Sequence, residues 1–294
     1  MGKNRENNSQ RGAQGFEDYY STLFSESWNE LKEALLKEPA YIQVEYSGCR
    51  PYFMDSASIC AALCLPVSDA SDVLDLCAAP GGKSIIIAGN ISSDTNMVSN
   101  ERSPERKNRL SKVLAESLPA SISNQIKTKC SDGAKWCRTE TECFDSILLD
   151  APCSSERHVL KDSHYLDQWS PARIKTLSIE QWSLLSCAWR LLRNGGYLLY
   201  STCALSPDEN DKVVSRLFKK FDSVVLVEKN KIEEIFSQNL KGIKEKCAGI
   251  SGIEDIFNSS VKTEMGFHLL PHKANGSGPI YFSLLHKSDD SAES

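Results

Sequence analysis

The sequence lacks the features that mark several common classes of protein. It contains no apolar run of the roughly 18 residues that a membrane-spanning helix requires. It also lacks an excess of basic residues, because 34 lysines and arginines stand against 39 aspartates and glutamates and give a net charge of −5. A protein that holds nucleic acid by bulk charge alone is basic, so any contact with nucleic acid requires a local patch or a partner. The charged fraction of 25% is ordinary and excludes wholesale disorder.

The sequence also has no Cys-x-x-Cys pair, although it contains eleven cysteines. The odd number and irregular spacing argue against a secreted disulfide framework and against a zinc knuckle. We therefore expect a reducing compartment and predict no metal site. The first 15 residues are polar and have no apolar core of the kind found in a secretory signal.

Short apolar strands alternate with helical segments along most of the chain. The strands are expected at 73–76, 97–100, 126–130, 144–149, 197–200, 224–227 and 278–285, and the clearest helices at 104–118, 177–193 and 207–220. This alternation predicts βαβ units and a mostly parallel sheet flanked by helices. Residues 138–143 and 229–262 carry little pattern and are left as loop or weak helix.

The sequence predicts four segments. Residues 1–15 are expected to be a disordered tail, and residues 16–66 a helical N-terminal extension in which 16–37 shows apolar residues at helical spacing. Residues 67–287 form the α/β domain that carries the chemistry. Residues 288–294 are an acidic tail.

Polar and sulfur-bearing residues collect at the predicted carboxyl ends of the strands. In chain order, these ends carry the turn Ala79-Pro80-Gly81-Gly82-Lys83, Glu101, Asp132 with Gly133, Asp150 with Cys153, and Cys203. Ligands bind at the carboxyl ends of the strands in an open parallel sheet. We therefore expect these residues to form one site.

The first three of these strand ends are typical of a nucleoside site. The glycines let a ligand approach the backbone where a helix begins, although the spacing is neither Gly-x-Gly-x-x-Gly nor that of a phosphate-binding loop. Glu101 follows by about twenty residues, where an acid accepts the hydroxyls of a ribose. Asp132 and Gly133 fall where an adenine amino group would be read, with an ordinary turn as the alternative.

Cys153 and Cys203 each follow an apolar strand within a few residues. Free cysteines are usually buried small hydrophobes, but two at the same edge of a sheet favour a chemical role. A thiolate beside a helix start and near Lys83 would have a lowered pKa and be nucleophilic. His158 lies close to Cys153 in the sequence, so a Cys–His hydrolase is an alternative of low weight.

The motifs that surround these residues resemble those of the Nop/Sun-domain RNA cytosine-5 methyltransferases over roughly residues 50–285. The resemblance rests on Asp75-Leu-Cys-Ala-Ala-Pro-Gly-Gly-Lys-Ser84, Asp150-Ala-Pro-Cys-Ser154 and Tyr200-Ser-Thr-Cys203. The stretches 52–58, 132–136, 155–158 and 278–282 resemble the mitochondrial member that modifies small-subunit rRNA more than the member that modifies a tRNA. The resemblance implies a Rossmann-like class I S-adenosylmethionine-dependent methyltransferase fold.

The resemblance also implies the roles of individual residues. Cys203 would be the nucleophile, Cys153 would assist release, Asp150 would lie between cofactor and base, and Lys83 would complete the catalytic set. The implied S-adenosylmethionine site comprises Cys77, Ala78, Ala79, Pro80, Gly81, Gly82, Lys83, Glu101, Arg106, Asp132, Gly133 and Asp150.

These roles agree with what the chemistry needs. Cytosine C5 becomes nucleophilic when a thiolate adds to C6. That addition needs a proton or hydrogen bond at N3, which a neutral Asp150 or one that shares a proton would supply. A cytosine inside a helix is out of reach, so the base must be unpaired or flipped.

The expected partners follow from the resemblance as well. We expect an RNA substrate, rRNA first and tRNA second, no membrane, a mitochondrial location, and a helical partner protein that supplies positive surface. The basic residues between 102 and 112 are either an RNA patch or a solvated helix face. The competing hypotheses are a DNA cytosine methyltransferase with Cys153 as nucleophile, a non-catalytic ribosome assembly factor, and a nicotinamide dehydrogenase, for which the glycine spacing is wrong.

Overall fold

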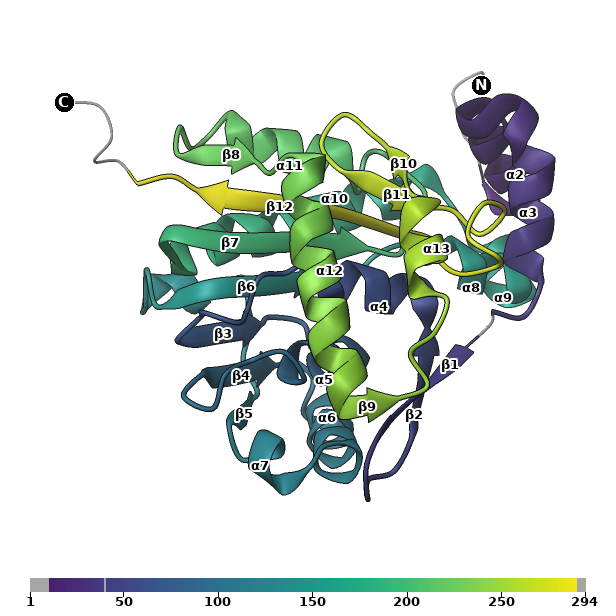
Figure 1. Cartoon of the computed structure of the whole chain (residues 1–294). Coiled ribbons are helices and arrows are strands. Elements are labelled where there is room, and N and C mark those ends of the chain that lie inside the picture. Colours follow the sequence, from purple (N-terminus) through teal and green to yellow (C-terminus); the bar gives the residue numbers. More distant parts are fainter. Residues whose placement is uncertain (1–10, 40, 290–294) are drawn as a thin grey trace.

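The computed structural model describes residues 11–39 and 41–289, which are built around a nine-stranded sheet (Figure 1). Its strands are β3 (Asp72–Asp75), β4 (Asn96–Asn100), β5 (Ile126–Lys129), β6 (Phe144–Asp150), β7 (Leu192–Thr202), β8 (Val224–Leu226), β10 (Val261–Lys262), β11 (Phe267–Leu269) and β12 (Ile280–Lys287). Their order is β10-β11-β12-β7-β6-β3-β4-β5, with β8 beside β12. Strands β3 to β7 pair in parallel, and the others pair antiparallel. The mostly parallel sheet is therefore confirmed.

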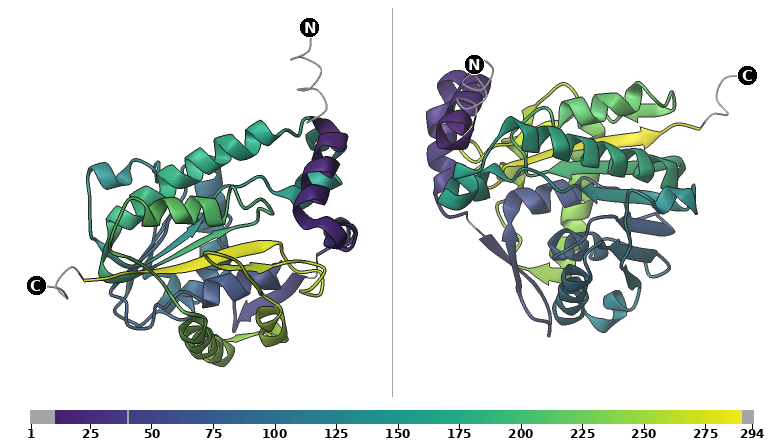
Figure 2. Two further views of the ribbon diagram at one scale, coloured as in Figure 1. Left: turned by 90° about the horizontal axis from the view of Figure 1, so that it is seen from above. Right: turned by 180° about the vertical axis from the view of Figure 1, so that it is seen from behind.

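Helices cover both faces of the sheet (Figures 1 and 2). One face carries α4 (Ser56–Leu63), α5 (Gly82–Ala88), α6 (Pro104–Ser117), α12 (Lys229–Lys246) and α13 (Ile253–Asn258), and the other carries α10 (Pro171–Leu191) and α11 (Asp211–Phe218). Successive strand residues point to opposite faces. Leu199 accordingly packs in the first core, while Leu198 and Tyr200 pack in the second. Burial on both faces explains why the central strands β6 and β7 contain continuous apolar runs, at residues 147–149 and 198–200.

The N-terminal segment forms a third core beside the sheet. It consists of α2 (Gly12–Phe24), the short 3₁₀ helix η1 (Ser25–Ser27) and α3 (Trp28–Leu36). Phe16, Tyr20 and Trp28 pack against Trp169, which follows α8 (Glu156–Lys161) and α9 (Ser163–Asp167). The extension thus contacts the segment that follows Cys153.

Two predictions for this segment need correction. The expected single helix at 16–37 is broken at Ser25, whose φ is +49°, and continues as α3. Residues 12–15, expected in a disordered tail, form the first turn of α2 because Gly15 and Phe16 are buried. The remainder of that predicted tail at 1–10 and most of the acidic tail at 290–294 lie outside the described residues. The domain boundaries at 16–66 and 67–287 stay predictions.

A hairpin and a small sheet follow the extension. β1 (Tyr41–Tyr46) pairs antiparallel with β2 (Tyr52–Asp55) and with β9 (Cys247–Ala248). Two short elements lie on either side of β5: α7 (Ala120–Ser123) precedes it and η2 (Trp136–Arg138) follows it. Within the described residues, none of the helices is long and apolar enough to cross a lipid bilayer.

The site lies where the strand order reverses. β3 is central, with β4 on one side and β6 on the other. The connections leave β3 and β6 in opposite directions at this point, which opens a crevice at their carboxyl ends. The turn after β3 and the loop after β6 carry the predicted site residues.

Candidate active site

The predicted residues converge on one edge of the sheet. A cavity of about 410 Å³ is lined by Cys77, Ala79, Glu101, Arg106, Asp132, Gly133, Asp150, Cys153 and Cys203, among others. A smaller adjoining cavity of about 120 Å³ is lined by Ala78, Pro80, Gly82 and Lys83, together with Asp75 and Asp150. Of the predicted residues, only Gly81 lines neither cavity.

Gly81 lines neither cavity, but it shapes the turn between β3 and α5. Its φ of +118° lies in the region that L side chains rarely adopt. A Cβ at this position would also lie 3.1 Å from Leu110 and Val113 of α6. The glycine therefore lets the chain reverse from β3 into α5 while α6 packs closely against the turn.

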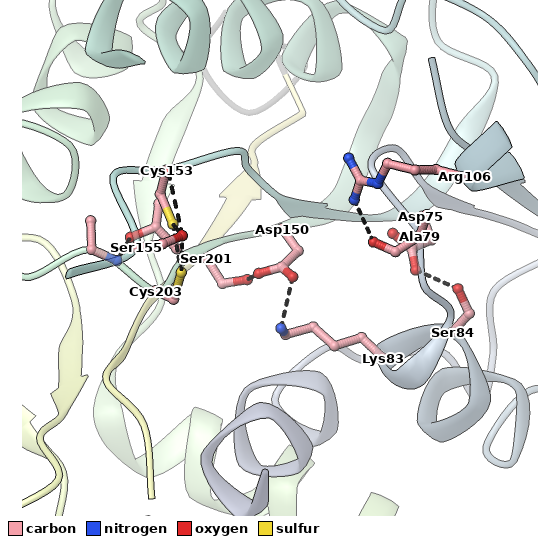
Figure 3. Close-up of polar contacts among 12 residues, drawn as sticks. Asp75, Ala79, Lys83, Ser84, Arg106, Asp150, Cys153, Ser155, Ser201 and Cys203 are labelled. Atoms are coloured by element: carbon pink, nitrogen blue, oxygen red, sulfur yellow. Dashed lines mark hydrogen bonds and ion pairs between the residues drawn. The ribbon is translucent and has the colours of Figure 1, made fainter. Parts of the chain in front are cut away.

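Glu101 and Arg106 tie the end of β4 to the glycine turn. Glu101 is 3% exposed, and its carboxylate accepts a hydrogen bond of 2.9 Å from the Ser103 backbone N–H. The Arg106 guanidinium lies 3.3 Å from Glu101 Oε2 and donates a hydrogen bond of 2.8 Å to the Ala79 carbonyl oxygen (Figure 3). The nearly buried acid therefore has a fixed position in the cavity wall.

Asp132 and Gly133 occupy the neighbouring wall. Asp132 pairs with Lys135 at 3.0 Å and accepts a hydrogen bond from the Ala134 backbone N–H, and Lys135 above all lowers the pKa of Asp132. A Cβ on Gly133 would lie 3.0 Å from Leu76 and 3.2 Å from Leu184. The absence of a side chain at Gly133 thus allows the backbone to lie close to Leu76 and Leu184.

Lys83 and Asp150 form an ion pair between the cysteines and the glycine turn (Figure 3). Lys83 Nζ donates to Asp150 Oδ2 at 2.8 Å, and Ser201 Oγ donates to Oδ1 at 2.7 Å. Burial alone would lower the pKa of Lys83, but the Asp150 carboxylate outweighs it and the net shift is upward. Both Asp150 oxygens therefore accept hydrogen bonds, and the carboxyl group is held with a Lys83 N–H beside it.

The two predicted cysteines are in contact. Cys153 Sγ and Cys203 Sγ lie 2.6 Å apart, and Ser155 Oγ lies 3.3 Å from Cys203 Sγ. The hydrogen bond with Cys203, together with burial, raises the pKa of the Cys153 thiol well above its ordinary value. The expectation of a lowered pKa is therefore wrong for Cys153, which holds its proton beside Cys203.

A buried acidic pair beneath the cysteines was not predicted. Glu156 and Glu209 are fully buried, and the Ser154 hydroxyl contacts Glu156 Oε1 on one side and Glu209 Oε2 on the other. Tyr20 also donates to Glu156 Oε1 at 2.5 Å. Burial raises the pKa of both carboxyl groups, that of Glu209 to about 7.

The hydrogen atoms in this group can be counted. The Ser154 hydroxyl has one hydrogen and cannot donate to two carboxylates at once. One of the two contacts therefore needs a protonated carboxyl group. Glu156 accepts from Tyr20 and from the Leu205 backbone N–H at 3.1 Å, so both its oxygens act as acceptors. The proton accordingly belongs on Glu209 Oε2, which donates to Ser154 Oγ, while Ser154 donates to Glu156.

The pair joins the two cysteine-bearing loops. Glu209, which follows Cys203 in the sequence, accepts a hydrogen bond of 2.9 Å from the backbone N–H of Ser154. Glu156, which follows Cys153, accepts from the backbone N–H of Leu205. Each acid therefore holds the loop that carries the other cysteine.

A second cavity reaches Cys203 from the opposite side. It has a volume of about 420 Å³, and its walls include Tyr41, Arg157 and Lys161. Cys203 and Ser155 line both this cavity and the one that contains Glu101. The thiol of Cys203 thus faces two compartments that different ligands can enter.

Comparison with known proteins identifies relatives of most of the chain. Residues 62–285 match the family model described as 16S rRNA methyltransferase RsmB/F. The chain is 30% identical over 244 residues to 5-cytosine rRNA methyltransferase NSUN4 of Mus musculus, covering 80% of this chain and 60% of that protein. It is 32% identical over 241 residues to the mitochondrial tRNA (cytosine(34)-C(5))-methyltransferase of Mus musculus, covering 80% and 63%. The chain therefore spans about three fifths of the length of these curated relatives.

Two solved structures share the fold. A methyltransferase homolog protein from Pyrococcus horikoshii superimposes with a TM-score of 0.65 at 21% identity, over 93% of this chain and 95% of that chain. NSun6 from Pyrococcus horikoshii, solved with SFG, superimposes with a TM-score of 0.60 at 22% identity, over 82% and 54%. The sheet and its flanking helices are thus those of a Rossmann-like class I methyltransferase.

Proposed function

Since the chain belongs to the RsmB/F family of rRNA methyltransferases, we propose that it transfers a methyl group from S-adenosylmethionine to C5 of a cytosine in RNA. The observation that carries the proposal is the position of Cys203. Its thiol lies between a cavity with a nucleoside-type acid and a second, open cavity, and Lys83 and Asp150 stand beside it. A nucleophile between two compartments suits a reaction that joins two substrates.

The first cavity fits the cofactor. Glu101 is suited to the ribose hydroxyls, and the absent side chain of Gly133 leaves room beside Leu76. Asp75 Oδ1 is buried and has no hydrogen-bond partner among the described residues, so it is available to the ammonium group of the methionine part. When bound, S-adenosylmethionine supplies an electrophilic methyl group on a sulfonium sulfur.

The residues of the chain prepare the cytosine. Cys203 forms a covalent bond from sulfur to C6, and the electron pair of the C5–C6 double bond moves toward N3 and makes C5 nucleophilic. The proton shared by Lys83 and Asp150 neutralises the charge that develops at N3. Once C5 carries the methyl group, the C5 proton passes to water and its electron pair re-forms the C5–C6 double bond. The bond from C6 to sulfur breaks, which releases the Cys203 thiolate, and N3 returns its proton to Lys83 and Asp150. Cys153, in contact with Cys203, assists this release.

The substrate we propose is rRNA, with mitochondrial small-subunit rRNA first. The stretches at 132–136 and 155–158 support rRNA over tRNA through their resemblance to the rRNA-specific member. A relative whose name includes the word mitochondrial supports that location. Because the chain carries a net charge of −5, we also propose a partner protein that contributes positive surface.

Transfer of a labelled methyl group tests the proposal. We expect the protein to label RNA, including immature small ribosomal subunits, and not DNA. Cys203→Ala should abolish labelling while S-adenosylmethionine still binds in calorimetry. Cys143→Ala is the matched control, because Cys143 lies at the opposite end of β6 from Asp150.

Bisulfite mapping of cellular RNA with and without the protein would then name the cytosine. Cofactor binding without labelling of any RNA would overturn the proposal and favour a non-catalytic assembly factor. Labelling that survives in Cys203→Ala would overturn the role given to that thiol.

A further inference from the structure

We propose that the outer face of the β1–β2 hairpin is a stacking platform for unpaired RNA bases that flank the target cytosine, formed by the rings of Tyr41 and Phe53. The inference rests on the proposed function and names how the RNA is held. It concerns the open cavity on the side of Cys203 away from Glu101.

The pairing register places both rings on one face of the hairpin. Tyr41 lies opposite Asp55, and Gln43 lies opposite Phe53. Directly opposite residues share a face, and diagonal neighbours on that face remain within reach of aromatic side chains. Tyr41 and Phe53 are each 59% exposed.

The other face of the hairpin is already occupied. Val44 and Met54 are buried and belong to the core below α4 and α5. The hairpin is therefore anchored by its inner face, and its outer face leaves both aromatic rings more than half exposed. Two large exposed rings on an anchored strand pair form a rigid surface.

The platform continues into the cavity that leads to the nucleophile. Tyr41, Asp55 and Cys203 all line this cavity of about 420 Å³. A volume of this size accommodates one nucleotide. When a cytosine enters this cavity toward Cys203, the flanking RNA nucleotides therefore lie near Tyr41. Phe53 lies beyond Tyr41, outside the cavity.

The facing wall carries groups that suit RNA. Arg157, His158 and Lys161 line the cavity, and the ring of Tyr165 lies 5.0 Å from that of His158. Arg157 is held by hydrogen bonds from Nη2 to the Ala34 and Gly276 carbonyl oxygens. Rings combined with fixed cations are typical of sites for single-stranded nucleic acid.

Charge explains why stacking should dominate. The two cations of this cavity are offset by two acids, since Lys161 pairs with Glu38 at 2.7 Å and Asp55 lies in the same cavity. The whole chain is also acidic. Phosphate attraction alone therefore contributes little, whereas stacking on a ring needs no net charge. A protein partner for this face is the competing occupant, but it would not explain why the aromatic face opens toward Cys203.

The test uses the whole chain and a short single-stranded oligoribonucleotide with 2-aminopurine beside one cytosine. Stacking quenches 2-aminopurine fluorescence, so the wild type should quench it on binding. Tyr41→Ala and Phe53→Ala should each lose much of the quenching and bind about tenfold more weakly. Tyr41→Phe, which keeps the ring, should behave as the wild type, and so should Val225→Ala, an exposed apolar residue on β8. Binding should also depend weakly on salt.

Unchanged affinity and quenching in the double variant Tyr41→Ala/Phe53→Ala would overturn the platform. If that variant instead lost binding to a protein partner while its RNA affinity was unchanged, the face would be a protein interface and the inference wrong. Methyl transfer to the same RNA separates the two proposals. A wild type that methylates no RNA contradicts the proposed function, whereas a double variant with an unchanged KM for RNA contradicts only the platform.

Discussion

Glu156 and Glu209, both fully buried, contact the single hydroxyl group of Ser154. One hydroxyl hydrogen cannot serve two carboxylates, so one acid carries a proton. The pair therefore holds one negative charge rather than two. Because each acid also binds the backbone of the loop that carries the other cysteine, this proton helps to fix the relative position of Cys153 and Cys203.

The assignment of the proton to Glu209 predicts that the two acids respond differently to the same substitution. At about pH 5, where Glu209 is mostly protonated, Glu209→Gln supplies a donor where Glu209 Oε2 faces Ser154, so the free energy of unfolding should change by less than about 1 kcal/mol. Glu156→Gln replaces one of two accepting oxygens by a donor that faces Tyr20 or Leu205, and should cost about 1–3 kcal/mol. Denaturant unfolding measures both. Equal losses in the two variants would contradict the assignment.

Two buried carboxyl groups should each lower the stability as the pH rises toward neutrality. Burial raises the pKa of Glu209 from 4.5 to about 7, and it raises the pKa of Asp75 from 3.8 to about 7. Between its unfolded and folded pKa values each of these groups binds more protons in the folded chain than in the unfolded chain, so its contribution to the free energy of unfolding decreases with rising pH in that window. Glu209→Gln should remove about 1–3 kcal/mol of the decline between about pH 5 and about pH 8. Parallel curves for the wild type and this variant would show that Glu209 does not titrate there.

The contact between Cys153 and Cys203 predicts which reaction step is slowed when Cys153 is replaced. Cys203 should still add to cytosine in Cys153→Ala, but release should slow because the neighbouring thiol is gone. A covalent RNA–protein adduct should then survive denaturing electrophoresis when RNA and S-adenosylmethionine are supplied. The double variant Cys153→Ala/Cys203→Ala should form none. Normal turnover by Cys153→Ala without an adduct would remove Cys153 from the mechanism.

The centre of the sheet was predictable because its strands are buried on both faces and stand out as apolar runs. The predicted strand at 144–149, for example, corresponds to β6 at Phe144–Asp150. α12 lies in the stretch 229–262 that was left as loop or weak helix. Ile232, Phe236 and Leu240 follow a helical period there, but the charged residues between them dilute the apolar signal. The strand expected at 197–200 begins earlier, since β7 starts at Leu192 and includes Gly195 and Gly196. A Cβ on Gly196 would lie 2.8 Å from the Asp145 carbonyl oxygen, so close approach of the strands requires the glycine.

The site was predictable to the extent that strand ends meet at one edge. Glu101, Asp150 and Cys203 needed only the topology to come together. The pair of Glu156 and Glu209 was not predictable, because acids in polar loops normally face solvent. Their burial depends on Tyr20 from α2, a contact between segments far apart in the sequence that no local pattern records.

Variants of the ion pair between Lys83 and Asp150 should affect the stability of the fold and the rate of methyl transfer differently. Lys83→Met leaves the Asp150 carboxylate without its cation in a largely buried place, and should cost about 1–3 kcal/mol of stability. The double variant Lys83→Met/Asp150→Asn removes both charges and should recover most of that loss, because replacing a buried pair is often nearly neutral. Methyl transfer should fall at least about 100-fold in both variants, since neither retains the shared proton for N3. S-adenosylmethionine affinity, measured by calorimetry, should fall much less than methyl transfer, because Glu101 and Gly133 remain although Lys83 and Asp150 also border the proposed cofactor site. A double variant that regained methyl transfer together with stability would show that the pair only supports the fold.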